Sequence, residues 1–177
     1  MAIKPTIYKM KISLSDFNRD YYGSLNLTLA KHPSETMERM MVRVLAFCLN
    51  AEEELSFTKG LSSIDEPDIW LKTLDGQISC WIEVGEPSVE RIKKSTRLAD
   101  KVKVYCFNSK SDVWWKQSQD KINLLAAFVF EFEWESVQRL SRFVTRTMDL
   151  SISISEDSLY VVTEQGECEL TLKALKE

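Results

Sequence analysis

Two acidic residues occupy matching ends of a predicted strand pair. Asp68 begins one short predicted strand, and Glu83 lies near the end of the next. Asp75-Gly76 between them is a strong hairpin turn signal, so folding brings the two carboxylates to the same end of the sheet. Carboxylates that converge beside a backbone carbonyl are the hard oxygen ligands that suit Mg²⁺ or Mn²⁺. The acid pair is therefore a candidate metal site.

Glu83 stands in an otherwise apolar segment, QISCWIEV (77–84). A buried, unpaired carboxylate is expensive, so it needs a cation, a lysine or a hydrogen-bond network. In the alternative interpretation, Glu83 lies at an exposed strand end and pairs with a lysine. Asp65 and Glu66, just before Pro67, are then solvated loop residues.

A helix predicted over residues 35–55 offers a third acid. Ser34 is a suitable N-cap, with Glu35 in the first turn. Glu38 lies about 70° from the centre of the apolar face, whereas Glu35 lies about 130° away and is expected to be exposed. Glu38 is therefore the helix acid placed to join a site beside the core. That apolar face consists of Met37, Met40, Met41, Val44, Leu45, Cys48 and Leu49.

The remaining pattern predicts one α/β domain, residues 1–177, with a central mixed sheet flanked by helices. Antiparallel strands are expected at both ends of the chain. The predicted order is strands 3–13 and 21–30, helix 35–55, strands 68–74 and 77–84, helix 88–100, strand 102–107, helix 111–119, strand 124–132, helix 135–147, and three strands within 149–174.

Composition excludes several classes of site. The single histidine, His32, rules out a site that needs two histidines and weakens a Ser-His-Asp interpretation. The four cysteines form no Cys-x-x-Cys pair and are expected to be small buried residues in a reducing compartment. No P-loop, dinucleotide glycine motif or Gly-x-Ser-x-Gly occurs. No stretch approaches the roughly 18 apolar residues of a membrane helix, so we expect a cytoplasmic protein without a membrane partner.

Charge is unevenly distributed along a chain whose net charge is −4. Residues 88–116 carry eight positive and three negative side chains, a net charge of +5. This segment is the stretch that could face a polyanion such as nucleic acid, with Trp114 and Trp115 stacking on it. The alternatives are a solvated helix and loop, and tryptophans that belong to the core.

The motifs resemble those of a known family. Pro67-Asp68, followed by Glu83-Val84-Gly85, resembles the PD-(D/E)xK nuclease motif. Nearly the whole chain resembles the YaeQ family, which implies a restriction-endonuclease-like core in a small bacterial cytoplasmic protein. The segments that carry this second resemblance are HPSETMERMM (32–41), DEPDIW (65–70), WIEVGEP (81–87), RIKKS (91–95) and SDVWWKQSQ (111–119).

The resemblance implies roles for individual residues. Asp68 matches the metal-binding aspartate, Glu83 the acid of the third motif, and Glu38 the helix glutamate that assists metal binding. The implied cation is Mg²⁺ or Mn²⁺. The motif lysine should stand two residues after Glu83, where this chain has Gly85.

Some superfamily members supply that lysine from the following helix, where Lys93 and Lys94 are the candidates. Lys93 lies about 80° from the packed side of the predicted helix and Lys94 lies nearly opposite it, so Lys93 is preferred. The other interpretation is that both lysines are solvated.

The sequence thus predicts a metal-dependent phosphodiesterase of nuclease type, with Asp68, Glu83 and Lys93 or Lys94 as catalytic residues. The alternative is a catalytically inactive nuclease-fold protein that acts as a nucleic-acid- or protein-interaction module, which Gly85 and the acidic net charge favour. We expect a monomer or a weak homodimer, because the terminal antiparallel strands provide edges that could pair.

Overall fold

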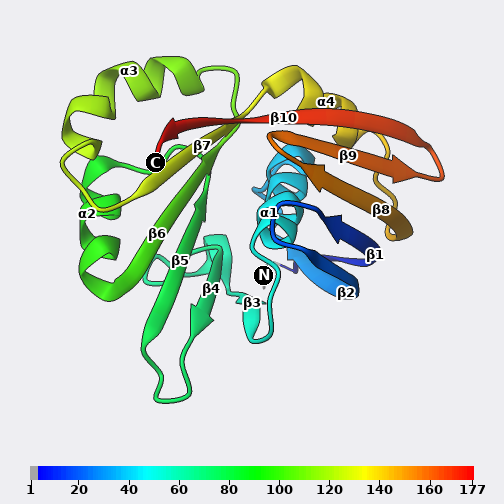
Figure 1. Ribbon diagram of the computed structural model, residues 1–177, viewed down its shortest axis with the longest axis horizontal. Coiled ribbons are helices and arrows are strands. Elements are labelled where there is room, and N and C mark those ends of the chain that lie inside the picture. The colour runs from blue at the N-terminus through cyan, green and yellow to red at the C-terminus, as the bar shows by residue number, and fades with distance from the viewer. Residues whose placement is uncertain (1–3) are drawn as a thin grey trace. The chain divides into compact units, whose positions relative to one another are not determined.

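The computed structural model describes residues 4–177, which form mixed sheets and helices (Figure 1). Two compact units emerge, each discontinuous in sequence. Unit 1 comprises residues 1–41 and 133–172, and unit 2 comprises residues 42–132 and 173–177. A mixed α/β protein was expected and is confirmed. A single domain over residues 1–177 stays a prediction.

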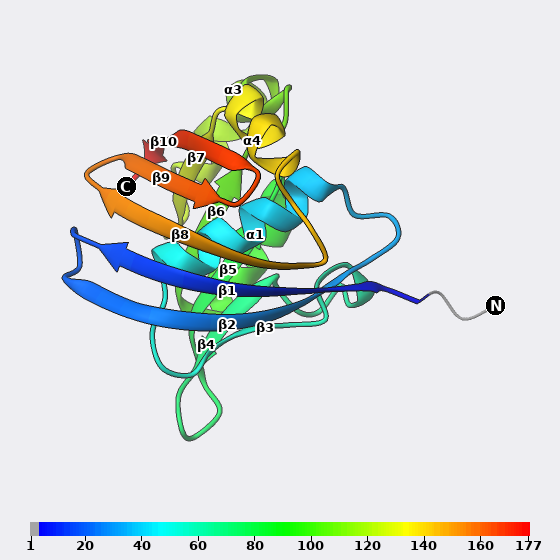
Figure 2. The ribbon, with the colours of Figure 1, turned by 90° about the vertical axis from the view of Figure 1, so that its right-hand side faces the viewer.

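Unit 1 is built on long alternating strands. Its strand order is β2-β1-β8-β9-β10, with β1 and β8 parallel and the other neighbours antiparallel, as Figure 2 shows. Alternate residues of β1 (Tyr8, Met10, Ile12 and Leu14) are buried, which is the pattern of a sheet with one covered face. The strands are β1 (Thr6–Asp16), β2 (Tyr21–Lys31), β8 (Thr147–Ser155), β9 (Ser158–Thr163) and β10 (Gly166–Lys176), and the unit also holds helix α4 (Trp134–Ser141).

The antiparallel pairing predicted for both ends of the chain is confirmed within unit 1. The first strand was expected over residues 3–13, and residue 3 lies outside the described residues. The last described residues of β10, from Lys173 onward, belong to unit 2.

Unit 2 contains the candidate site. Its strand order is β7-β6-β5-β4-β3, in which β3, β4 and β5 are antiparallel whereas β5, β6 and β7 are parallel. The elements are β3 (Leu55–Phe57), a 3₁₀ turn η1 (Gly60–Ser62), β4 (Ile69–Lys72), β5 (Ile78–Val84), α2 (Val89–Leu98), β6 (Ala99–Cys106), α3 (Ser111–Ile122) and β7 (Phe128–Phe132).

One face of this sheet packs against α2 and α3. The buried cluster there joins Trp81 of β5 to Ile92 of α2 and Ile122 of α3. Helix α2 begins where the sequence predicts, because the Ser88 side chain accepts a hydrogen bond from the Arg91 amide. The near-continuous apolar run of β5 is explained by its central place between β4 and β6.

Helix α1 (Met37–Leu49) is shorter than the predicted 35–55. Thr36, not Ser34, caps it, since the Thr36 hydroxyl accepts a hydrogen bond from the Arg39 amide. The predicted exposure of Glu35 is wrong. Glu35 lies in the turn before the helix, is only 4% exposed and pairs with Arg39 at 2.6 Å. The strand β3, at the far end of the predicted helix, was missed because it has only three residues.

Within residues 4–177, no helix is both long enough and apolar enough to span a bilayer. The four cysteines are buried and free, as expected.

Candidate functional site

The β4–β5 hairpin brings Asp68 and Glu83 together. The antiparallel ladder ends at the pair Ile69–Ile82, and Asp68 and Glu83 are the next residues of the two chain segments beyond that pair. The Asp68 amide donates to the Ile82 carbonyl at 3.1 Å, which continues the pairing to the strand end. Both acids are buried, Asp68 being 3% and Glu83 5% exposed. The two acids therefore lie at the same end of the strand pair, where the negative charge of Asp68 acts on Glu83.

Asp68 closes the end of the strand pair. Its Oδ2 accepts a 2.8 Å hydrogen bond from the Val84 amide. Its backbone carbonyl accepts from the Thr58 amide at 3.1 Å. These bonds fix Asp68 between Val84 of β5 and Thr58, the residue that follows β3.

Glu83 accepts hydrogen bonds from two side chains. Trp81 Nε1, two residues earlier on the same face of β5, and Arg91 Nε on α2 each lie 2.8 Å from Oε1. The pKa of Glu83 is raised from 4.5 to about 7, because burial and then the negative charge of Asp68 outweigh the lowering effects of Arg91 and Trp81. The folded protein thus holds a carboxyl group that titrates near neutral pH.

Arg91 is the residue of the site that the sequence interpretation missed. Its Nη1 donates to the Ile64 carbonyl at 2.7 Å and its Nη2 to the Glu66 carbonyl at 2.8 Å, while Nε binds Glu83. A signal was available, because a buried acid needs a cation and Arg91 is the first basic residue of the helix that follows Glu83.

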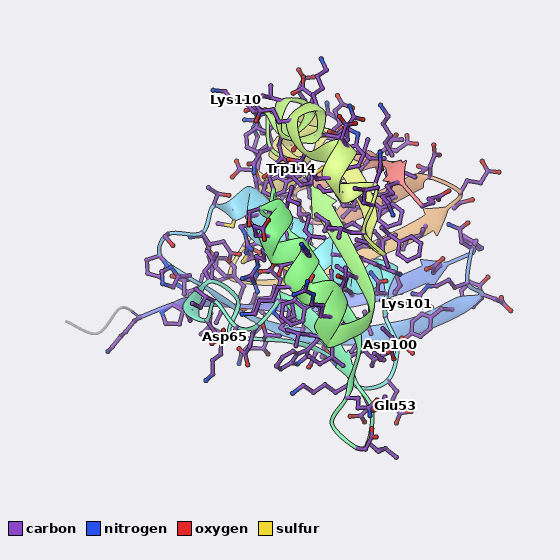
Figure 3. All side chains as sticks on the ribbon, turned by 90° about the vertical axis from the view of Figure 1, so that its left-hand side faces the viewer. Glu53, Asp65, Asp100, Lys101, Lys110 and Trp114 are labelled. Atoms are coloured by element: carbon purple, nitrogen blue, oxygen red, sulfur yellow. The ribbon has the colours of Figure 1, made fainter. Side chains whose placement is uncertain are left out.

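The two candidate lysines lie elsewhere on α2. Lys93 and Lys94 are both exposed. Lys93 follows Arg91 by two residues, about 200° around the helix, and so lies on the other side of α2. Lys94 is about 60° from Arg91, and its Nζ lies 3.8 Å from Asp65 Oδ1, an exposed acid that Figure 3 labels beside α2. Within residues 4–177, neither lysine is joined to Glu83 by a hydrogen bond or ion pair.

Gly85 occupies the position of the motif lysine for a reason of backbone geometry. Its φ is +115°, a region that side-chain-bearing residues rarely adopt. Its amide donates to the Tyr105 carbonyl of β6 at 2.8 Å, so the chain turns here while still bound to the sheet. A lysine at position 85 would strain this backbone.

Glu38 belongs to unit 1, whereas Asp68 and Glu83 belong to unit 2. Glu38 is half-buried and its Oε1 accepts a 3.4 Å hydrogen bond from the Ser141 hydroxyl. Over the described residues, no group of three or more His, Cys, Asp or Glu side chains is placed to hold a metal ion. Of the three predicted metal ligands, unit 2 contains Asp68 and Glu83.

The tryptophans of the basic segment are packed rather than presented to solvent. Trp114 and Trp115 lie against the α2–α3 core and are half-buried. Trp114 Nε1 donates to the Pro87 carbonyl at 2.9 Å, and Figure 3 shows this side chain between α3 and α2. The core interpretation of these residues is therefore the correct one.

Together, fold and site define a mixed α/β protein with an opposed, buried carboxylate pair at a strand end. The chain belongs to the YaeQ family, because the sequence model described as YaeQ protein matches residues 1–172. It is 39% identical over 176 residues to "Uncharacterized protein YaeQ" of Escherichia coli (strain K12), which covers 98% of this chain and 97% of that one. Identity to the Salmonella typhi protein of the same description is 40% over 176 residues.

Two crystal structures have closely similar folds. The YaeQ protein from Xanthomonas axonopodis pv. citri superposes with a TM-score of 0.94 at 32% identity, covering 97% of this chain and 98% of that chain. The YaeQ protein from Pseudomonas syringae gives a TM-score of 0.93 at 33% identity, covering 98% of this chain and 97% of that one.

Proposed function

We propose that this YaeQ-family chain is a metal-dependent phosphodiesterase that cleaves nucleic acid in a variant PD-(D/E)xK site. The observation that carries the proposal is the pair of buried acids, Asp68 and Glu83, at one end of the β4–β5 hairpin, with the charge of Asp68 acting on Glu83. The order of elements supports a restriction-endonuclease-like core: from residue 42 onward, the α1 segment is followed by β3, β4 and β5, then by α2 and β6. Helix, three strands, helix, strand is the order that the sequence resemblance implies.

The donor set fits Mg²⁺ or Mn²⁺. Mg²⁺ in phosphoryl-transfer sites is commonly held by one or two carboxylates, with waters and substrate phosphate completing the shell. Both hydrogen bonds that Glu83 receives within residues 4–177 end on Oε1, so Oε2 is the oxygen available to a ligand. The like charge of Asp68 disfavours ionised Glu83, and a cation between them would relieve that repulsion. When bound, the metal would activate water and polarise the scissile phosphate.

The chain's other residues then take supporting roles. Trp81 and Arg91 orient Glu83 through Oε1, and Oε2 would be the oxygen that binds the ion. Of the two lysines, Lys94 is on the Arg91 side of α2 and is the better placed to contact a phosphate.

A second candidate function has its own support. The left-handed backbone at Gly85 leaves no strand lysine, and the Arg91 guanidinium is occupied by three acceptors of the chain itself. A nuclease-fold module that binds nucleic acid or protein without turnover would have this arrangement.

The deciding experiment is cleavage of single- and double-stranded DNA and RNA with Mg²⁺ or Mn²⁺. We expect cleavage by the wild type and by E90Q, which replaces an exposed glutamate of α2, but not by D68N or E83Q. Cleavage that persists in both site variants would overturn the site. Failure of the wild type to cleave any of these substrates would favour the interaction module.

A further inference from the structure

Residues 58–67, called the 58–67 loop below, connect β3 to β4 beside the acid pair. The loop is closed at its base, because the Thr58 amide donates to the Asp68 carbonyl at 3.1 Å. Its tip forms a single turn in which the Ser62 amide donates to Lys59 at 3.0 Å and the Ser63 amide to Gly60 at 3.1 Å. The Lys59 amide donates to Glu66 Oε2 at 3.2 Å. Local hydrogen bonds therefore give the loop a defined form.

Packing contributes little to holding this loop. Residues 59–66 are all half-buried or exposed, and Ile64 is 83% exposed. Residues 59–66 contain no buried side chain and so gain little hydrophobic stabilisation, and their position depends on polar contacts with their neighbours. Of these, the Lys94–Asp65 pair is long and solvent-exposed, which makes it weak.

The strong contact is with Arg91. Two of its nitrogens bind carbonyls of the loop, those of Ile64 and Glu66, at 2.7 and 2.8 Å. The third nitrogen binds Glu83 at 2.8 Å, and that carboxylate is 7% exposed in its side chain. One guanidinium thus joins the loop, strand β5 and helix α2.

We propose that Arg91 is the positioning residue of this site, which ties the 58–67 loop to Glu83 so that the loop forms a fixed wall beside the acid pair. The loop comes close to the acids on this side: a Cβ placed on Gly60 would lie 3.7 Å from Asp68 Oδ1. The planar guanidinium suits this role because its N–H groups diverge in fixed directions toward three acceptors, whereas a lysine ammonium is a compact point charge. The effect on catalysis rests on the proposed function, but the tie, by which we mean the Arg91 bridge between the 58–67 loop and Glu83, does not.

Amide hydrogen exchange of the free protein tests the tie directly. In R91Q and in R91K, we expect exchange at the Lys59, Ser62 and Ser63 amides to become at least about tenfold faster, because both loop carbonyls lose their charged donor. R97Q, at an exposed arginine of the same helix, should leave these amides unchanged. Exchange within about twofold of wild type in both Arg91 variants, with strands of unit 1 as the internal reference, would overturn the proposal.

Cleavage kinetics test whether the tie positions the acid pair. R91Q should lower kcat and raise KM, since Glu83 loses its partner and the loop loosens. R91K should recover kcat, because an ammonium can still pair with Glu83, but its KM should stay raised. Equal recovery of kcat and KM in R91K would overturn the two-part role. If the wild type cleaves no substrate, the proposed function fails, and the exchange result still decides the tie.

Discussion

Glu83 and Glu86 stand three residues apart at the end of β5, yet their surroundings differ in kind. Glu86 accepts hydrogen bonds from the amide and the side chain of Asn108, at 3.0 and 2.5 Å, and from the Ser111 hydroxyl. These donors are neutral: Asn108 lies just before α3, and Ser111 is the first residue of α3. Glu83 instead faces another acid, Asp68, and shares an arginine with a loop.

This difference indicates a structural role for Glu86 and a role in the chemistry of the site for Glu83. Glu86 holds the N-terminal end of α3 against the end of β5, a role in which an anion is favoured by the helix dipole. Glu83 is buried beside a like charge, and its pKa is raised as a result. Perturbed acids of this kind are typical of functional sites, which is why Glu83 and not Glu86 is assigned to the chemistry.

The largest expected effect is the pH dependence caused by Glu83. The carboxyl ionises near pH 7 in the folded chain and near 4.5 when unfolded, so the folded state holds the extra proton between these values. The free energy of unfolding should therefore fall as pH rises through this window, by about 3 kcal/mol in total. Urea titrations of metal-free protein from pH 4 to 8 measure it. E83Q should not show this decrease in the free energy of unfolding. D68N should lower the upper limit of the pH range over which the decrease occurs, because it removes the like charge beside Glu83. A decrease that is unchanged in E83Q would show that another group causes it.

Restoring the motif lysine should destabilise the protein. G85K places a side chain at φ +115°, and we expect a loss of about 1–3 kcal/mol in the free energy of unfolding. G85A is the matched control. Within residues 4–177, no atom beyond the two neighbouring residues lies within 4 Å of a Cβ added at Gly85, so the cost comes from the backbone and should be similar in both variants. A stable G85K beside an unstable G85A would contradict this explanation.

Removing the structural acid should have a smaller effect. E86Q keeps the shape but loses the charge opposite three donors, and we expect a loss of about 1 kcal/mol in the free energy of unfolding. Its nucleic-acid cleavage should match that of the wild type. Loss of cleavage with unchanged stability would reverse the roles assigned to Glu86 and Glu83.

The exposed pair on the loop should contribute least. K94Q and D65N should each change the free energy of unfolding by less than about 0.5 kcal/mol, because solvent screens a pair 3.8 Å apart. A double-mutant cycle measures the coupling between the two side chains. A coupling above about 1 kcal/mol would show that this pair, rather than Arg91 alone, holds the loop.

Sequence reasoning located the acid pair because local rules sufficed. The Asp75-Gly76 turn predicts a hairpin, and a hairpin brings the start of one strand and the end of the next to the same end of the sheet. The isolated acid in an apolar strand then indicated a site. The boundaries of helix α1 were less predictable, because Ser34 and Thr36, two positions apart, could both serve as caps.

The partner of Glu83 could not be read from a motif. A lysine at the motif spacing would not have indicated Arg91. The role of Arg91 depends on tertiary contacts, because its guanidinium binds both Glu83 of β5 and the Ile64 carbonyl of the 58–67 loop. The division into two compact units could not be predicted from the sequence either, because each unit combines segments that are far apart in the chain. Tertiary placement of this kind is not encoded in spacing.

The most direct test of the central claim is Mn²⁺ binding, followed by electron paramagnetic resonance of the free ion in titrations of wild type, D68N, E83Q and E86Q. We expect the wild type and E86Q to bind one ion with equal affinity. Substitution of either opposed acid should weaken binding at least about tenfold, because each removes a charged ligand. Equal binding by all four proteins, or loss of binding in E86Q alone, would contradict the assignment of Asp68 and Glu83 as the metal site.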